Sequence, residues 1–117
     1  MSDRLRVYIS GPITLGDQRE NVRLAMGVAH ELINCGYAPL CPHLSWFYPF
    51  ANDVPHATWI AADLPWVEVS DAVLRLPGES KGADEEVAFA ELCGIPVFTS
   101  IGNLVAWDTL AREVFNG

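Results

Sequence analysis

Basic side chains are scarce in this chain of 117 residues. Seven lysine and arginine residues stand against 15 aspartate and glutamate residues, which gives a formal net charge of −8. Because nucleic-acid polymers are bound through their phosphates by a basic surface, this balance argues against such a partner. A single nucleoside or nucleotide is not excluded, since a small molecule requires only a pocket.

Long hydrophobic runs are also missing, although half of the residues are hydrophobic. No apolar stretch approaches the ~20 residues that span a bilayer. The opening segment MSDRLRVYIS shows neither the apolar core nor the cleavage site of a signal peptide. We therefore expect a cytoplasmic protein without membrane contact, and the length predicts a single domain over residues 1–117.

Glycine motifs that bind phosphate groups are absent as well. The sequence contains no G-x-G-x-x-G, and its first glycine loop, GPITLGDQ, lacks the Gly-Lys-Ser/Thr ending of a P-loop. Taken alone, Gly11 and Pro12 indicate a tight turn. A dinucleotide or ATP site of the usual kind is therefore not expected, and no cofactor is predicted.

Cysteine is rare, and its odd count excludes a complete disulfide framework. Cys35, Cys41 and Cys93 are predicted to be free thiols that pack as small hydrophobic side chains. Cys41 and His43 are close in sequence, but nothing nearby completes a set of four metal ligands. No metal site is predicted.

What is present alternates between strand and helix. Short apolar runs predict strands, and longer segments with apolar residues at helical spacing predict helices. This alternation is typical of a parallel sheet covered on both faces, so we predict an α/β fold, a flavodoxin- or Rossmann-like three-layer sandwich with four to five strands. The predicted strands are Leu5–Ser10, Tyr37–Cys41, Asp71–Leu76 and Ile95–Thr99, and the predicted helices are Asp17–Cys35, Thr58–Val69, Gly82–Gly94 and Asn103–Phe115.

Two helix starts carry specific expectations. Pro65 removes a hydrogen bond from the second helix, so this helix is expected to begin near Asp63 or to be kinked there. Asn103 is expected to cap the last helix.

One carboxylate in the third predicted helix lies on the side that is expected to face the protein interior. At ~100° per residue, Glu86 falls on a stripe of apolar and small residues, whereas Asp84, Glu85 and Glu91 fall outside it. Burying a carboxylate is costly unless a partner compensates it, so Glu86 is a candidate nucleophile or general base. The alternative is a structural role, in which Glu86 bonds backbone amides or an interior arginine.

The predicted fold also indicates where a ligand binds. In open parallel sheets, ligands bind outside the carboxyl ends of the strands. Three loops follow strands there: Gly11–Thr14, Pro42–Ala57 and Pro77–Gly82. In the third loop, Ser80 and the amides around Gly82 lie at a helix N-terminus, which favours anions, although Ser80 could also simply cap the helix.

The second loop is rich in aromatic side chains. Four of five consecutive positions are aromatic: Trp46, Phe47, Tyr48 and Phe50. A loop of this length often acts as a lid, and an aromatic ring stacks on a flat base with about 1–3 kcal/mol. The alternatives are that these rings close the core edge or form a subunit interface. Trp46 and His43 are candidate substrate-binding residues, whereas His56 is interpreted as an ordinary polar side chain.

Together these segments resemble the nucleoside 2-deoxyribosyltransferase superfamily, which includes the 2′-deoxynucleoside 5′-phosphate N-hydrolases. The resemblance runs from Val7 to about Phe98. It is carried by VYISGPI, Asp63-Leu64, DAVLRLPG and Ser80-x-Gly82-x-x-x-Glu86, followed by Ala90 and Gly94-Ile95-Pro96-Val97. It implies cleavage of the N-glycosidic bond of a (deoxy)nucleoside or nucleoside 5′-monophosphate, with hydrolysis or transfer to a second base, by a homo-oligomer. The alternative is a nucleotide-binding module without catalysis on the same fold.

Carried over residue by residue, the resemblance assigns three catalytic positions. It makes Glu86 the nucleophile, Tyr8 the residue that positions it, and Asp63 the residue that handles the base and its leaving proton. From pattern alone, Asp63 would otherwise cap a helix restarting at Pro65.

The resemblance gives a mixed indication on the 5′-phosphate. Ser80 matches a serine that helps hold this phosphate in the nucleotide hydrolases, and Gly11 matches the sugar end of the site. However, Pro12 and Thr14 stand where those hydrolases have serine and arginine, and Gly-Pro is more similar to the transferases. Lys81 is the one nearby cation. The full candidate binding set is Gly11, Pro12, His43, Trp46, Ser80 and Gly82.

Overall fold

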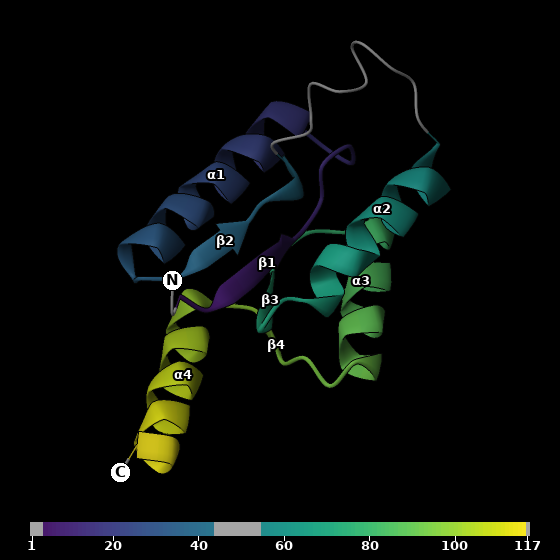
Figure 1. Cartoon of the computed structure of the whole chain (residues 1–117). Coiled ribbons are helices and arrows are strands. Elements are labelled where there is room, and N and C mark those ends of the chain that lie inside the picture. Colours follow the sequence, from purple (N-terminus) through teal and green to yellow (C-terminus); the bar gives the residue numbers. More distant parts are fainter. Residues whose placement is uncertain (1–3, 44–54, 117) are drawn as a thin grey trace.

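A parallel sheet of four strands organises the chain, as predicted. The computed structural model describes residues 4–43 and 55–116. Its strands, in the spatial order β2-β1-β3-β4, are β1 (Arg6–Ser10), β2 (Ala38–Leu40), β3 (Ala72–Arg75) and β4 (Val97–Phe98). The helices that alternate with them are α1 (Gln18–Asn34), α2 (His56–Glu68), α3 (Lys81–Leu92) and α4 (Ile101–Asn116) (Figure 1). Within the described ranges, none of these helices is both long enough and apolar enough to cross a membrane.

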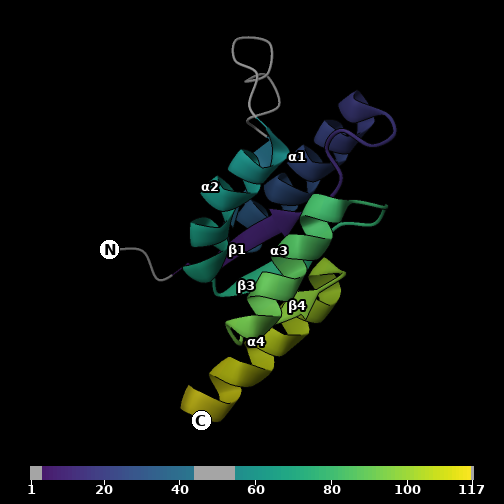
Figure 2. The ribbon, with the colours of Figure 1, turned by 90° about the vertical axis from the view of Figure 1, so that its right-hand side faces the viewer.

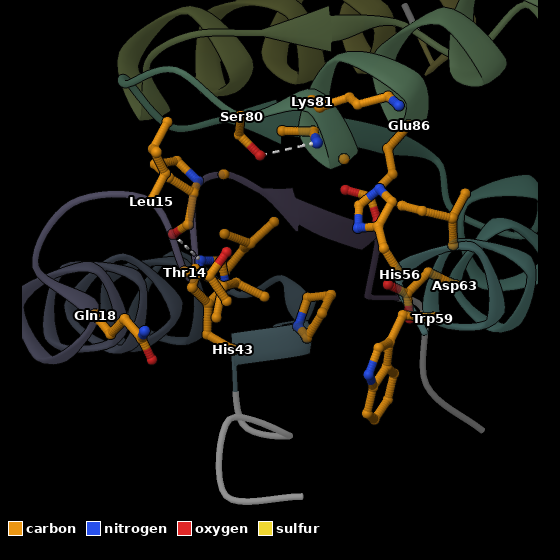
Figure 3. Close-up of a pocket in the computed structure, with 18 residues that line it drawn as sticks. Thr14, Leu15, Gln18, His43, His56, Trp59, Asp63, Ser80, Lys81 and Glu86 are labelled. Atoms are coloured by element: carbon orange, nitrogen blue, oxygen red, sulfur yellow. Dashed lines mark hydrogen bonds between the residues drawn. The ribbon is translucent and has the colours of Figure 1, made fainter. Parts of the chain in front are cut away.

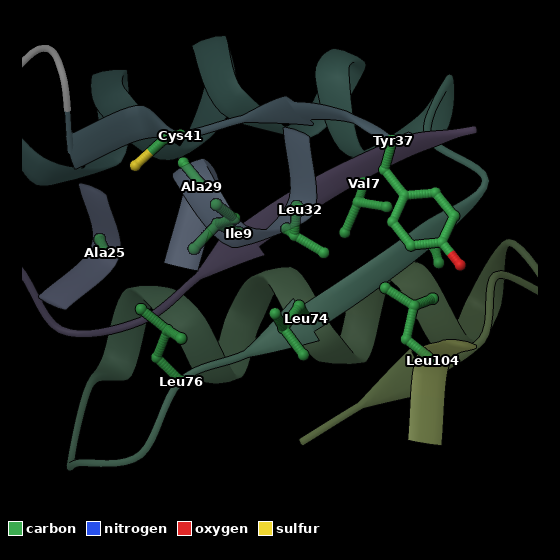
Figure 4. Close-up of a cluster of buried hydrophobic side chains, with 11 residues drawn as sticks. Val7, Ile9, Ala25, Ala29, Leu32, Tyr37, Cys41, Leu74, Leu76 and Leu104 are labelled. Carbon is green, nitrogen blue, oxygen red and sulfur yellow. The ribbon is translucent and has the colours of Figure 1, made fainter. Parts of the chain in front are cut away.

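Helices cover both faces of the sheet, so the molecule has three layers (Figures 1 and 2). The face under α1 and α4 carries the main core, drawn in Figure 4, which includes Val7, Ile9, Ala25, Ala29, Leu32, Tyr37, Leu74 and Leu104. The opposite face carries a smaller core of Tyr8, Val67, Val73 and Ala90. Because successive strand residues point to opposite faces, β1 presents Tyr8 and Ser10 towards α2 and α3.

The loop between β3 and α3 is tied down by an arginine at the end of β3. The Arg75 guanidinium donates hydrogen bonds to the carbonyl oxygens of Leu76 and Gly78, the latter at 2.9 Å. It also donates to Asp84 Oδ1 in the first turn of α3, at 3.1 Å. These bonds connect the end of β3 to the loop and to the first turn of α3, so they fix the position at which α3 starts.

The range of α2 agrees with the predicted helix Thr58–Val69. The helix runs from His56 to Glu68 with Pro65 inside it, so only the alternative of a start near Asp63 is wrong. Asp63 therefore lies within the helix and is not its cap. Proline costs the helix one hydrogen bond, but α2 packs along α3, and tertiary packing of this kind outweighs local propensity.

The cap of α4 also differs from the prediction. This helix begins at Ile101, and Ser100 Oγ accepts a hydrogen bond from the backbone N–H of Asn103 at 3.1 Å. Ser100 is thus the capping residue, and the assignment of Asn103 is wrong. Both residue types are good N-caps, so the sequence offered two neighbouring candidates.

The thiols are free, but only one of them is packed as expected. Cys41 is buried, whereas Cys35 and Cys93 are exposed, so the prediction is wrong for these two. Cys35 and Cys93 are the C-terminal caps of α1 and α3. There the chain turns away from the packed layer, so side chains at these positions contact solvent.

Gly11 is required by the close approach of β1 to the end of β3. A Cβ atom added to Gly11 would lie 2.8 Å from the Cβ of Leu76, and neither atom can rotate away from its backbone. We expect Gly11→Ala to lower the free energy of unfolding by about 1–3 kcal/mol through overpacking. Urea denaturation measures this value.

Gly27→Ala is the matched control for that substitution. Gly27 lies within α1, and a Cβ there meets no atom within 4 Å. Alanine in a helix interior should raise the free energy of unfolding by about 0.5–1 kcal/mol. A Gly11→Ala protein as stable as the unmodified one would contradict the assigned contact.

Candidate active site

A cavity of about 860 Å³ opens at the carboxyl edge of the sheet. This is the edge at which a parallel sheet is expected to bind ligands, and the volume lies within the usual range of small-molecule pockets. Figure 3 shows Glu86, Asp63, His56 and Trp59 on one side, Thr14, Leu15, Gln18 and His43 on the other, and Ser80 and Lys81 between them. The loops after β1, β2 and β3 therefore meet α2 and α3 around one space.

The Glu86 carboxyl is buried against this cavity and held on both oxygens. Its residue is 6% exposed, which confirms the inward placement predicted from helical spacing. Oε2 accepts a hydrogen bond from the Tyr8 hydroxyl at 2.5 Å, and Oε1 accepts one from the Ser10 hydroxyl at 2.9 Å. The partners are thus two hydroxyl groups on one face of β1, and not the amides or arginine of the structural alternative.

Burial and a second carboxyl set the protonation of Glu86. Burial raises the pKa of Glu86 from its ordinary 4.5 to about 7; the bonds from Tyr8 and Ser10 oppose this rise, and the charge of Asp63 adds to it. Burial also raises the pKa of Asp63, against its interactions with Glu86 and Tyr8. The pKa of Tyr8 is raised by burial and then by Glu86 and Asp63, so Tyr8 remains a hydrogen-bond donor.

These shifts make Glu86 and Asp63 one titrating pair. Two carboxyl groups that interact in a buried site lose their protons in two steps that belong to the pair. Near neutral pH the second proton is still partly bound, because burial and mutual repulsion both disfavour two charges. Such a pair can supply a carboxylate nucleophile and a proton donor in the same cavity.

Asp63 lies beside Glu86 because α2 packs close to the start of α3. A Cβ added to Gly82 would lie 3.2 Å from His56 Cε1 and 3.3 Å from Ile60 Cδ1, so these two side chains would have to shift by a few tenths of an ångström. His56, Ile60 and Asp63 recur at helical spacing and share the face of α2 that lines the cavity. Gly82 thus has a packing role in addition to lining the cavity.

Charges at the cavity edge are few. Lys81 is the only lysine or arginine among the described lining residues, and its side chain is 83% exposed. Lys81 Nζ and His56 Nε2 lie 4.0 and 3.8 Å from the carboxylate of Glu85. Within residues 4–43 and 55–116, no three His, Cys, Asp or Glu side chains gather closely enough to hold a metal ion.

Ser80, in the loop after β3, and His43, in the loop after β2, both line the cavity, as predicted from the positions of these loops. Ser80 Oγ accepts a hydrogen bond from the N–H of Ala83 at 3.1 Å, which confirms its role as the cap of α3. His43 is 1% exposed, and its Nε2 lies 3.1 Å from the carbonyl oxygen of Pro12. Burial lowers the pKa of His43, and the bond to Pro12 partly opposes this.

The structure brings most of the predicted residues together. The cavity is lined by Gly11, Pro12, His43, Asp63, Ser80, Gly82 and Glu86. Tyr8 is not a lining residue, but it donates a hydrogen bond to Glu86, which is one. Trp46 lies outside the described residues. The sequence interpretation missed Ser10, which alternation along β1 could have found two positions after Tyr8. It also missed His56 and Trp59, which helical spacing from Asp63 along α2 could have found.

Fold and site together define an α/β protein with a carboxylate-lined pocket for a small molecule. The chain belongs to the family described as a domain of unknown function (DUF7768), whose model matches residues 5–100. No curated protein matches the sequence. Among solved structures, the fold is similar to that of a 2-deoxyribosyltransferase from the psychrotolerant bacterium Bacillus psychrosaccharolyticus. The TM-score is 0.56 at 17% identity, over 82% of this chain and 75% of that chain, and this likeness confirms the predicted Rossmann-like fold.

Proposed function

We propose that this protein cleaves the N-glycosidic bond of a nucleoside with Glu86 as the nucleophile. The observation that carries the proposal is the buried Glu86 carboxyl at the cavity, held by Tyr8 and Ser10, with Asp63 beside it. The fold likeness to a 2-deoxyribosyltransferase, which is described as a biocatalyst for nucleoside synthesis, supports the substrate class. Two carboxyl groups suffice for this chemistry, as in retaining glycosidases.

In the first step, a Glu86 oxygen attacks C1′ of the sugar while the C1′–N bond breaks. The carboxylate stabilises the positive charge that develops on the sugar and then forms an ester with C1′. The electron pair of the broken bond goes to the base nitrogen, and the single proton of the pair moves from Glu86 to Asp63 and from there to the base. Hydrogen bonds from Tyr8 and Ser10 favour the ionised form of Glu86 at the moment of attack.

In the second step, an acceptor attacks C1′ and frees Glu86. The C1′–O bond to the carboxylate breaks, and Asp63 takes a proton from the acceptor. Water as the acceptor gives hydrolysis, and a second base gives transfer.

Four residues, Gly11, Pro12, Ser80 and Gly82, are proposed to hold the sugar end of the nucleoside. Trp46 remains a predicted base contact, and a homo-oligomer remains predicted; a monodisperse monomer in light scattering would contradict the latter.

The test is release of free base from ribo- and deoxyribonucleosides and their 5′-monophosphates, followed by chromatography with and without a second base. Release from any of them supports the proposal, and dependence on the second base identifies transfer. Absence of release from all compounds by folded protein would contradict it. If the same compounds raised the melting temperature, binding without catalysis would replace it.

The same panel tests a preference for nucleosides over nucleotides. A 5′-phosphate would enter a cavity lined by Asp63 and Glu86, where the exposed Lys81 already faces Glu85. We expect nucleosides to exceed their monophosphates in kcat/KM by at least about tenfold, which equals roughly 1.4 kcal/mol of repulsion. Equal or faster release from the monophosphates would contradict this expectation.

A further inference from the structure

His43 has a nitrogen atom that lacks a hydrogen-bond partner. The residue follows β2, is 1% exposed and borders the cavity. Its Nδ1 is buried without a partner, and among the described residues no other buried side-chain nitrogen or oxygen shares this condition. An unsatisfied buried polar atom costs about 1–3 kcal/mol, so its presence at a binding cavity calls for an explanation.

The bond to Pro12 decides what kind of group Nδ1 is. A carbonyl oxygen can only accept a hydrogen bond, so Nε2 of His43, at 3.1 Å, must carry the hydrogen. A neutral imidazole has one N–H, which leaves Nδ1 with an unprotonated lone pair. Burial favours this neutral form. The ring therefore holds an acceptor that is fixed in orientation by the turn after β1, and because this atom is covered, a ligand donor reaches it only when the covering atoms shift.

We propose that His43 Nδ1 accepts a hydrogen bond from an N–H or O–H group of the bound nucleoside and so selects substrates that carry this donor. This inference rests on the proposed function for the identity of the ligand. Figure 3 shows His43 on the side of the cavity opposite Glu86 and Asp63, so a nucleoside held at C1′ by Glu86 extends towards it. The donor is an amino group of the base or a hydroxyl group of the sugar.

The same geometry excludes competing ligands. A ligand carbonyl oxygen or unprotonated ring nitrogen at this place would set two acceptors against each other and leave both unsatisfied. Sites that are built to hydrogen-bond a substrate group discriminate strongly against analogues without it. His43 would therefore act as a specificity-determining residue, separate from the chemistry at Glu86.

Two substitutions separate the roles of the ring nitrogens. In His43→Gln the amide nitrogen can replace Nε2 towards Pro12, but no acceptor remains at the position of Nδ1. In His43→Asn the amide oxygen can replace Nδ1, but the bond to Pro12 is lost. Both are made in a Glu86→Gln background so that ligands are not consumed, and circular dichroism confirms that each variant is folded.

Binding is measured by calorimetry with two matched ligand pairs. Adenosine and purine riboside differ in the amino group of the base, and 2′-deoxyadenosine and 2′,3′-dideoxyadenosine differ in a sugar hydroxyl. With His43 present, we expect one pair to show a preference for the donor of about tenfold or more. The pair that shows it identifies the base or the sugar as the source. His43→Gln should remove the preference, and His43→Asn should retain most of it.

Several results would overturn the inference. Unchanged affinity and preference in His43→Gln, or no donor preference in either pair, would do so. Nitrogen-15 NMR adds a test without ligand, because a hydrogen on Nδ1 of His43 would also overturn it. Base release without any effect of His43 would leave the proposed function intact and refute this inference alone. Binding that depends on His43, without base release by the unmodified protein, would refute only the proposed reaction; failure of these four compounds and of every nucleoside of the release panel to bind would refute both.

Discussion

Glu86→Gln is expected to lower kcat for base release by at least about a thousandfold, the scale seen when a nucleophile is removed. The glutamine amide is nearly the same size as the carboxyl and can still accept a hydrogen bond from Tyr8 or Ser10. It lacks the negative charge and cannot form the ester with C1′. Chromatography of released base measures the effect, and release that survives in the variant would refute Glu86 as nucleophile.

The same substitution has a pH-dependent effect on stability. The pKa of Glu86 in the folded protein, about 7, lies above its ordinary 4.5, so the folded state holds this proton more tightly. The resulting stability is fully present below about pH 4.5 and is lost as the pH rises through about 7. The total loss is about 3 kcal/mol at about 1.4 kcal/mol per unit.

Glutamine carries no such proton, so the variant should gain on the unmodified protein as the pH rises. Urea unfolding of both proteins at about pH 5 and about pH 8 tests this, because only the change between the two conditions matters. A stability difference that is the same at both conditions would contradict the assigned electrostatics. Circular dichroism at each condition establishes that both proteins start folded.

Asp63→Asn is expected to change both the rate and the shape of the pH profile. Loss of the proton donor should lower kcat/KM by about a hundredfold, in the range for general acid catalysis. In the unmodified protein the active form holds one proton on the pair, so kcat/KM should fall as the pH rises through about 7. In the variant this alkaline fall should disappear, because Glu86 then only needs to be ionised.

Measurement of kcat/KM from about pH 5 to about pH 9 distinguishes the two profiles. Glu91→Gln is the control, since Glu91 is an exposed carboxylate on the same helix as Glu86. It should leave the profile unchanged. An alkaline fall near the same pH in Asp63→Asn would show that another group is responsible.

The sheet and the inward side of α3 could be predicted because their signals are local. Apolar runs and glycine stops are read within a few residues, and helical spacing alone placed Glu86 towards the interior. The range of α2 was predicted closely as well, but whether Pro65 interrupts this helix could not be decided in this way. Its apolar residues occupy several sides, with Val67 buried and Trp66 half exposed, and the helix follows a segment of loop-like composition.

The finer features of the site depend on contacts between distant segments. The acceptor role of His43 follows from a carbonyl group 31 positions earlier, which no local pattern reveals. The side chains of His56 and Ile60 on α2 come close to α3 at Gly82, where no side chain stands between them. The sequence shows a glycine at position 82, but only the packing of α2 on α3 shows which side chains lie against it.

The hydrogen bonds that hold Glu86 close very long loops of chain. Tyr8 and Ser10 precede Glu86 by 78 and 76 positions. The entropy cost of closing loops of this size must be met by the sheet and its cores before the bonds can form, so the site orders late in folding. No single segment of the chain carries the active arrangement, and recovery of activity after refolding would report assembly of the whole domain.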